Sequence, residues 1–151
     1  MLCLVSVPIK LYRHKLFSMK TLLAVIGGFT LGAATILYQK KPLEKSIEDG
    51  AEIYQDFCLQ CHLDSGQGVS GVFPPLAGSD YLLDNIDRSI RGIKYGLSGT
   101  IVVNDEEYNG IMQNQGLDNQ EIADVMNYIL NNWGNQSDEI ITAERVSAIK
   151  E

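Results

Sequence analysis

The stretch Cys58-Leu59-Gln60-Cys61-His62 (CLQCH) decides the fold of this chain of 151 residues. Its two thiols are separated by two residues, so they lie about one helical turn apart. Thiols at this spacing can each add across a vinyl group of one porphyrin, and the adjacent imidazole then lies under the iron. Cys-x-x-Cys-His is the pattern of c-type haem attachment. We therefore predict that Cys58 and Cys61 form thioethers to one haem c and that His62 is the proximal iron ligand.

Three other interpretations of these cysteines explain less. A disulfide between them leaves His62 without a role. A thioredoxin-like redox motif is expected in β-α-β surroundings, and the flanking sequence does not have that pattern. A zinc site needs a fourth ligand, and the only other Cys and His, Cys3 and His14, lie near the N-terminus. We interpret Cys3 as a residue without chemistry.

The N-terminal part of the chain is basic and contains a long apolar run. Residues 1–45 carry seven Lys or Arg and one Glu, a formal charge of +6. Residues 21–38 (TLLAVIGGFTLGAATILY) are 18 residues without a charge. As a helix they would span roughly 27 Å, close to a hydrocarbon core of about 30 Å. We predict a basic leader at 1–20, whose true start residue is left open, and a transmembrane anchor or signal peptide at 21–38.

Basic residues ahead of the apolar run favour a cytoplasmic N-terminus, so the rest of the chain is expected to be exported. The run is longer than a usual signal-peptide core, and no convincing Ala-x-Ala site precedes Lys40, so we favour an uncleaved anchor over a cleaved signal peptide. A buried helix of a soluble protein is the third alternative. Residues 39–47 (QKKPLEKSI), interrupted by Pro42, are expected to be a charged linker.

The rest of the chain is acidic. Residues 46–151 carry five Lys or Arg and eighteen Asp or Glu, a formal charge of -13. Such a charge repels phosphate backbones, so we predict that the protein binds no nucleic acid. It also steers the protein toward basic surfaces on a partner.

Three segments of the acidic part have helical spacing. The last has the clearest start, because Asp118 and Glu121 form a capping box ahead of an apolar stripe. In the middle segment Gly92 is a weak point and Gly96 a stop. The three segments are residues 48–61, 80–95 and 118–133.

We predict an all-α domain of three or four helices over residues 48–134, followed by a C-terminal tail at 135–151. Residues 100–109 (TIVVNDEEYN) have the pattern of a minimal hairpin, and Thr142 can cap a short helical turn in the tail. The Gly-, Ser- and Pro-rich loop over residues 64–80 is long for so small a domain. Something other than protein is therefore expected to fill the centre.

The distal ligand of the iron is sought among the side chains of the exported part, which has no His besides His62 and only two methionines. Met126 lies in the apolar stripe of the last helix and is expected to pack in the core. Met112 lies fifty residues after His62 in a loop, and a thioether there would raise the reduction potential relative to two imidazoles. We predict Met112 as the distal ligand; an open or water-filled site is the alternative.

Over residues 48–133 the sequence resembles the class I cytochromes c. In that family a glycine and an aromatic residue precede Cys-x-x-Cys-His at fixed offsets, where this chain has Gly50 and Tyr54. They pack against the last helix, whose matching positions are Val125 and Tyr128. The resemblance implies the class I cytochrome c fold, with three to four helices around one covalently attached haem, here preceded by an N-terminal transmembrane or signal helix.

The resemblance also implies roles for residues away from the haem motif. Pro74-Pro75-Leu76 matches the family's Pro-x-Leu, which implies that the Pro74 carbonyl accepts a hydrogen bond from His62 and that Leu76 packs on the haem. Tyr108 begins the family's Tyr-Asn-Gly-x-Met loop; its hydroxyl lies toward the haem, or its ring is only packed. The family commonly has Pro after the ligand Met, and Gln113 here leaves that loop less ordered in advance.

The function implied is electron transfer without catalysis: one haem c with His/Met ligation carries electrons between respiratory or periplasmic redox partners. Its place would be the outer face of the cytoplasmic membrane or the periplasm of a bacterium. One alternative is the haem c subunit through which electrons enter a larger dehydrogenase or oxidase complex, with the tail after Trp133 as a docking segment. Another is a haem-based ligand sensor or peroxidase-like enzyme, in which Met112 leaves the distal site open.

Overall fold

The structure, a computed structural model, describes residues 41–151. These residues form one compact unit, Lys41–Glu151. The predicted leader at 1–20 and the predicted anchor or signal peptide at 21–38 lie outside the described residues. Within residues 41–151, no helix is both long and apolar enough to cross a membrane.

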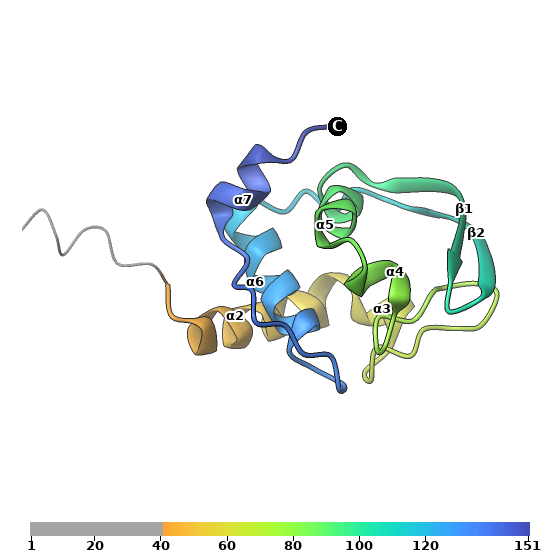
Figure 1. Cartoon of the computed structure of the whole chain (residues 1–151), viewed down its shortest axis with the longest axis horizontal. Coiled ribbons are helices and arrows are strands. Elements are labelled where there is room, and N and C mark those ends of the chain that lie inside the picture. Colours follow the sequence, from red (N-terminus) through yellow and green to blue (C-terminus); the bar gives the residue numbers. More distant parts are fainter. Residues whose placement is uncertain (1–40) are drawn as a thin grey trace, which may run out of the picture. The chain divides into compact units, whose positions relative to one another are not determined.

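The described unit consists of helices and one two-stranded hairpin, which lies at an edge of the unit beside α4 and α5 (Figure 1). In chain order the elements are α2 (Leu43–Phe57), α3 (Leu59–His62), α4 (Asp80–Leu83), α5 (Ile86–Tyr95), β1 (Leu97–Val103), β2 (Glu106–Met112), α6 (Asn119–Leu130) and α7 (Ala143–Ala148). The predicted capping box of α6 is confirmed: Asp118 accepts from the backbone of Glu121, whose side chain accepts from the backbone of Asp118.

Helices α2 and α6 cross closely at Gly50. A Cβ atom on Gly50 would lie 2.1 Å from the carbonyl oxygen of Asp124 and 2.9 Å from Cβ of Tyr128, so a glycine is required there. Next to the crossing, the ring of Tyr54 lies 5.4 Å from that of Tyr128 and 5.0 Å from that of Trp133. The Gly50 crossing and the packing of Tyr54 on the last helix are as the sequence predicts.

Gly50→Ala is expected to destabilise the protein by about 3 kcal/mol, because the new methyl group forces α2 and α6 apart in a packed core. Urea unfolding followed by far-UV circular dichroism measures the change. Gln55→Ala, at an exposed position of the same helix, is the control and is expected to stay within about 0.5 kcal/mol of the wild type. Equal stability of the two variants would contradict the close crossing.

Helix α2 begins at Leu43, so the last five residues of the predicted linker at 39–47 are helical, more than one helical turn. Polar contacts to α6 hold this first turn: Ser46 Oγ donates to Asp124 Oδ1 at 2.5 Å and Lys41 Nζ donates to Asp124 Oδ2 at 2.6 Å. Asn127 Nδ2 in turn donates to Ser46 Oγ at 2.8 Å. This segment is polar because its side chains bind the buried carboxylate of Asp124. The local sequence pattern does not reveal that distant contact.

The middle helical segment is divided. Instead of one helix over 80–95, α4 ends at Leu83 and α5 starts anew behind Asn85, whose side chain accepts from the backbone N–H of Arg88 at 2.9 Å. Asn is a strong N-cap residue, and this cap interrupts the apolar spacing. The predicted stop at Gly96 is confirmed, with φ of 89°.

The tail at 135–151 is part of the packed unit. Ile141 and Val146 are 2% and 0% exposed and belong to the core. Asn127 holds the segment by accepting from the N–H of Ile141 and donating to its carbonyl, both at 2.8 Å. The predicted cap is confirmed, since Thr142 Oγ1 accepts from the N–H of Arg145. The tail is therefore packed on the domain core, and its role as a docking segment stays a prediction.

The all-α prediction is wrong in one respect, because β1 and β2 form an antiparallel sheet that starts at Leu97 and ends at Met112. The hairpin expected at 100–109 is therefore present and longer. Its turn is Asn104-Asp105, both with positive φ of 50° and 64°, as a tight hairpin turn requires. Paired strands carry the chain past α5 and deliver Met112 at the end of β2 (Figure 1).

Candidate functional site

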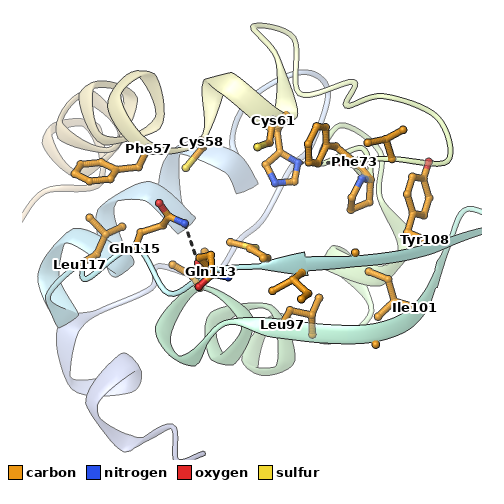
Figure 2. Close-up of a pocket in the computed structure, with 18 residues that line it drawn as sticks. Phe57, Cys58, Cys61, Phe73, Leu97, Ile101, Tyr108, Gln113, Gln115 and Leu117 are labelled. Atoms are coloured by element: carbon orange, nitrogen blue, oxygen red, sulfur yellow. Dashed lines mark hydrogen bonds between the residues drawn. The ribbon is translucent and has the colours of Figure 1, made fainter.

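An apolar cavity with two lobes lies between the Cys-x-x-Cys-His segment, the 64–80 loop, α5 and the hairpin. The lobes measure about 230 Å³ and about 90 Å³. Figure 2 shows the larger lobe, with Cys58 and Cys61 on one wall and Leu97 and Ile101 of β1 on the opposite wall. Residues that line both lobes make them one site: Cys58, His62, Pro74, Ile93, Leu97, Ile101 and Met112.

The two cysteines present free thiols to the cavity. Cys58 is the residue between α2 and α3, and Cys61 lies within α3; both are half-buried and unpaired. Burial, together with the neighbouring Cys61, raises the pKa of Cys58 to about 11. No disulfide joins the two cysteines in this structure. Both thiols line the cavity, where one common ligand can reach them.

His62 ends α3 and is 9% exposed. Its Nδ1 lies 2.9 Å from the carbonyl oxygen of Pro74. A carbonyl only accepts, so Nδ1 carries the proton and the Nε2 lone pair is free to bind a metal. Burial lowers the pKa of His62, and the hydrogen bond to Pro74 opposes part of that shift. The contact that the resemblance implied for Pro74 is present.

The 64–80 loop is shaped to bring Pro74 back to His62. Gly68 has φ of 62°, and a Cβ atom there would lie 2.3 Å from the carbonyl oxygen of Phe73 and 2.6 Å from that of Pro74. Its N–H donates to the carbonyl of His62 at 3.0 Å. The carbonyl of Gly66 accepts from Leu76 and Ala77 at 2.7 and 3.0 Å. These glycines are therefore needed for close backbone contacts within the loop and do not indicate a flexible loop.

Met112 lies at a strand end rather than in an open loop. Its backbone pairs with Leu97. The neighbouring Gly96 (φ 89°) allows the two backbone segments to approach closely, because a Cβ atom there would lie 2.9 Å from the Met112 carbonyl oxygen. Beyond it, Gln115 Nε2 donates to the Gln113 carbonyl at 2.8 Å (Figure 2). Gln113 stands where the family commonly has a Pro that would order the segment. In this structure the pairing of Met112 with Leu97 orders it instead.

The remaining predicted site residues lie around the same cavity. Leu76 lines the smaller lobe and packs against the core, and Met126, fully buried in α6, lines that lobe as well. Tyr108 is 4% exposed and its ring lines the larger lobe. Its hydroxyl donates to Glu106 Oε2 at 2.8 Å rather than to any group of the cavity wall.

Glu106 links the hairpin to the 64–80 loop, a role that the sequence analysis missed. Its carboxylate accepts hydrogen bonds from the hydroxyls of Ser70 and Tyr108. The Ser70 contact, with that of Tyr108, lowers the pKa of Glu106 below its ordinary value of 4.5. Ser70 lies 36 residues from Glu106 in the sequence and Tyr108 lies 2 residues from it. No local sequence pattern indicates the contact with Ser70.

Glu106→Gln is expected to lower stability at neutral pH but not in acid. A carboxyl group with a lowered folded-state pKa stabilises the fold above its unfolded pKa, and this contribution disappears as pH falls through the folded value. The difference in urea midpoint between wild type and variant should therefore shrink below about pH 4.5. Ser137→Ala, in the tail, is the control. A difference that is independent of pH would contradict the role of the carboxylate.

The donor set of the cavity fits a covalently bound porphyrin. It combines two thiols one turn apart, a neutral imidazole with a free Nε2, a thioether and otherwise apolar walls. Iron in haem is bound by such His and Met ligands. Within residues 41–151, no three His, Cys, Asp or Glu side chains are grouped so as to hold a bare metal ion.

Comparison with known proteins gives consistent matches. The cytochrome c family model matches residues 47–133. Cytochrome c-552 from one strain of Thermus thermophilus is 38% identical over 122 residues, covering 76% of this chain and 72% of that protein. A second Thermus thermophilus cytochrome c-552 is 44% identical over 91 residues, or 57% and 69% of the two chains. The cytochrome c subunit of an alcohol dehydrogenase (quinone) from Gluconobacter oxydans is 28% identical over 104 residues, 67% of this chain and 22% of that subunit.

Proposed function

Because the chain belongs to the cytochrome c family, and so carries one covalent haem c and transfers electrons without catalysing a reaction, we propose residues for that site. Cys58 and Cys61 form the thioethers, His62 is the proximal ligand and Met112 is the distal ligand. The haem supplies the one-electron change between ferric and ferrous iron. The residues of this chain hold it and keep water away.

The observation that carries this assignment is the hydrogen bond between His62 Nδ1 and the Pro74 carbonyl at 2.9 Å. It fixes the tautomer and the ring orientation, which leaves Nε2 as the one basic nitrogen toward the cavity. Met112 lines the same cavity from β2. Leu76 and the ring of Tyr108 contribute apolar walls, and the Tyr108 hydroxyl, bonded to Glu106, holds the hairpin against the loop.

The mouth of the larger lobe is suited to a brief encounter with a redox partner. Phe57, Val72 and Ile111 line this lobe and are 45%, 53% and 72% exposed. Exposed apolar side chains next to a cofactor, on a domain with excess negative charge, favour a partner with an apolar contact and a basic rim.

We propose in addition that the domain works on the outer side of the cytoplasmic membrane and is held there by residues 21–38. The support is the uncharged run of 18 residues behind a basic segment. Fractionation of cells that make the full chain would find it in the membrane fraction, released by detergent and not by salt. Recovery in the soluble periplasmic fraction would show a cleaved signal peptide instead.

A second candidate function is that of a haem c subunit in a dehydrogenase complex. The similarity to a cytochrome c subunit of an alcohol dehydrogenase (quinone) supports it. The tail after Trp133, expected as the docking segment, packs on the domain core through Ile141 and Val146. Extraction in mild detergent followed by size-exclusion chromatography separates the two functions. A free carrier elutes alone, and a subunit elutes with its dehydrogenase.

The test of the proposed site is the spectrum and mass of the protein made with haem-maturation machinery. A mass increased by one haem, a ferric methionine-to-iron charge-transfer band and no rapid carbon monoxide binding by the ferrous protein are the expected results. Rapid binding of carbon monoxide at neutral pH would overturn the His/Met assignment and favour the ligand sensor. Absence of covalent haem would overturn the site itself.

A further inference from the structure

Arg88 of α5 has an incomplete set of hydrogen bonds beside the cavity. Among the described residues, its Nε is the only buried side-chain nitrogen or oxygen atom without a hydrogen-bond partner. Leaving a buried donor without a partner destabilises the fold, and more so when the group is charged. An unpaired guanidinium nitrogen in a well-packed domain therefore indicates a partner that the chain itself does not provide.

The rest of the Arg88 side chain is held in one place. Its Nη2 donates to the carbonyl of Tyr81 at 2.5 Å, and its Cζ lies 3.7 Å from the centroid of the Tyr81 ring. The Asn85 cap fixes the backbone at the same residue. Stacking on an aromatic ring and a hydrogen bond to a carbonyl orient the planar guanidinium. The free Nε is therefore a positioned donor rather than the end of a mobile side chain.

Arg88 is also the charged group of the cavity. It lines the smaller lobe together with Cys58 and His62, and no other Lys, Arg, Asp or Glu of the described residues lines either lobe. It forms no ion pair with a described carboxylate. It also lines the outer groove of about 520 Å³ that contains Arg91, so it lies between the cavity and the solvent.

Haem c has two propionate carboxylates, each a planar acceptor that matches the donors of a guanidinium. We propose that Arg88 binds one haem propionate through Nε, and that Tyr81 positions the guanidinium for this contact. The inference rests on the haem site proposed above. It explains the unpaired nitrogen, the stacked side chain and the presence of a single cation in an apolar cavity.

Two consequences follow for the bound haem. A fixed positive charge beside it favours ferrous over ferric iron and raises the reduction potential. The same charge keeps the propionate ionised, because a neighbouring cation lowers the pKa of a carboxyl group. The reduction potential of the wild type is then independent of pH over about pH 5 to 8, since no proton accompanies the electron.

The test compares Arg88→Gln with Arg91→Gln and Arg88→Lys in the haem-loaded protein. Arg91→Gln is the matched control: it removes the same charge from the same helix at an exposed residue that lines only the outer groove. Arg88→Lys keeps the charge and removes the Nε donor. Two measurements are made on each protein: the reduction potential against pH, and the redox-induced infrared difference spectrum with ¹³C-labelled haem propionates.

Arg88→Gln is expected to lower the reduction potential and to make it fall with rising pH, because the released propionate now takes up a proton on reduction. It should also shift the labelled carboxylate band. Arg88→Lys should shift the band with a smaller change in potential, and Arg91→Gln should leave the band and the pH dependence unchanged. An unshifted band in Arg88→Gln, or equal effects of the Gln variants at 88 and 91, overturns the proposal.

Failure of this inference and failure of the proposed haem site give different results. If the wild type carries no covalent haem, the site itself is wrong. If the haem is present, and its methionine-to-iron band shows that Arg88→Gln is folded and ligated, an unchanged propionate band refutes only the role of Arg88. A folded Arg88→Lys variant gives the same decision where Arg88→Gln is not stable enough to purify.

Discussion

Met112→Ala is expected to keep its covalent haem and to lose the ferric methionine-to-iron charge-transfer band. Loss of the thioether removes the ligand that favours ferrous iron, so the reduction potential should fall by on the order of 0.1–0.3 V, within the roughly 0.8 V range that axial ligands control. The ferrous variant should also bind carbon monoxide rapidly, because its distal position is open. Absorbance spectra and a redox titration measure all three effects.

Met126→Leu is the matched control, since Met112 and Met126 are the two methionines within residues 41–151. Leu has a similar volume, so the buried position in α6 should tolerate it at a cost below about 1.5 kcal/mol. Its spectrum and potential should equal those of the wild type. Loss of the band in Met126→Leu, with retention in Met112→Ala, would exchange the assignments of the two residues.

The Cys58→Ala, Cys61→Ala double variant is expected to lose the mass of one haem and most of its stability. Without a haem, the larger lobe of about 230 Å³ is an apolar void. At roughly 24 cal/mol per Å³ such a void costs on the order of 5 kcal/mol, comparable to the whole stability of many domains. Intact mass and urea unfolding measure the two effects.

Cys3→Ala removes the one cysteine outside the motif and is the control for the double variant. It should leave the haem attached and the urea midpoint unchanged. A double variant that still carried a covalent haem would refute the assignment of Cys58 and Cys61. A double variant without haem that kept the wild-type midpoint would show that the cavity closes on itself.

The sequence predicted well where the signal lies in neighbouring residues. The capping box of Asp118 and Glu121, the cap of Thr142 and the stop at Gly96 are each set by a few consecutive side chains, and each is present. Prediction was less accurate where a distant contact decides the outcome. Helix α2 starts early because Ser46 bonds to Asp124, 78 residues away, and the hairpin is longer than its β-branched run because its strands pair.

The motif Cys58-Leu59-Gln60-Cys61-His62 by itself determined that the chain is built around a covalently bound haem c, because attachment needs two thiols and an imidazole at one fixed spacing. Only the tertiary structure decided how that site is completed. It brings the Pro74 carbonyl to His62 and β1 to Met112, and it leaves one nitrogen of Arg88 unpaired beside the cavity. Covalent chemistry depends on neighbours along the chain, whereas ligand orientation and charge depend on groups that only folding brings together.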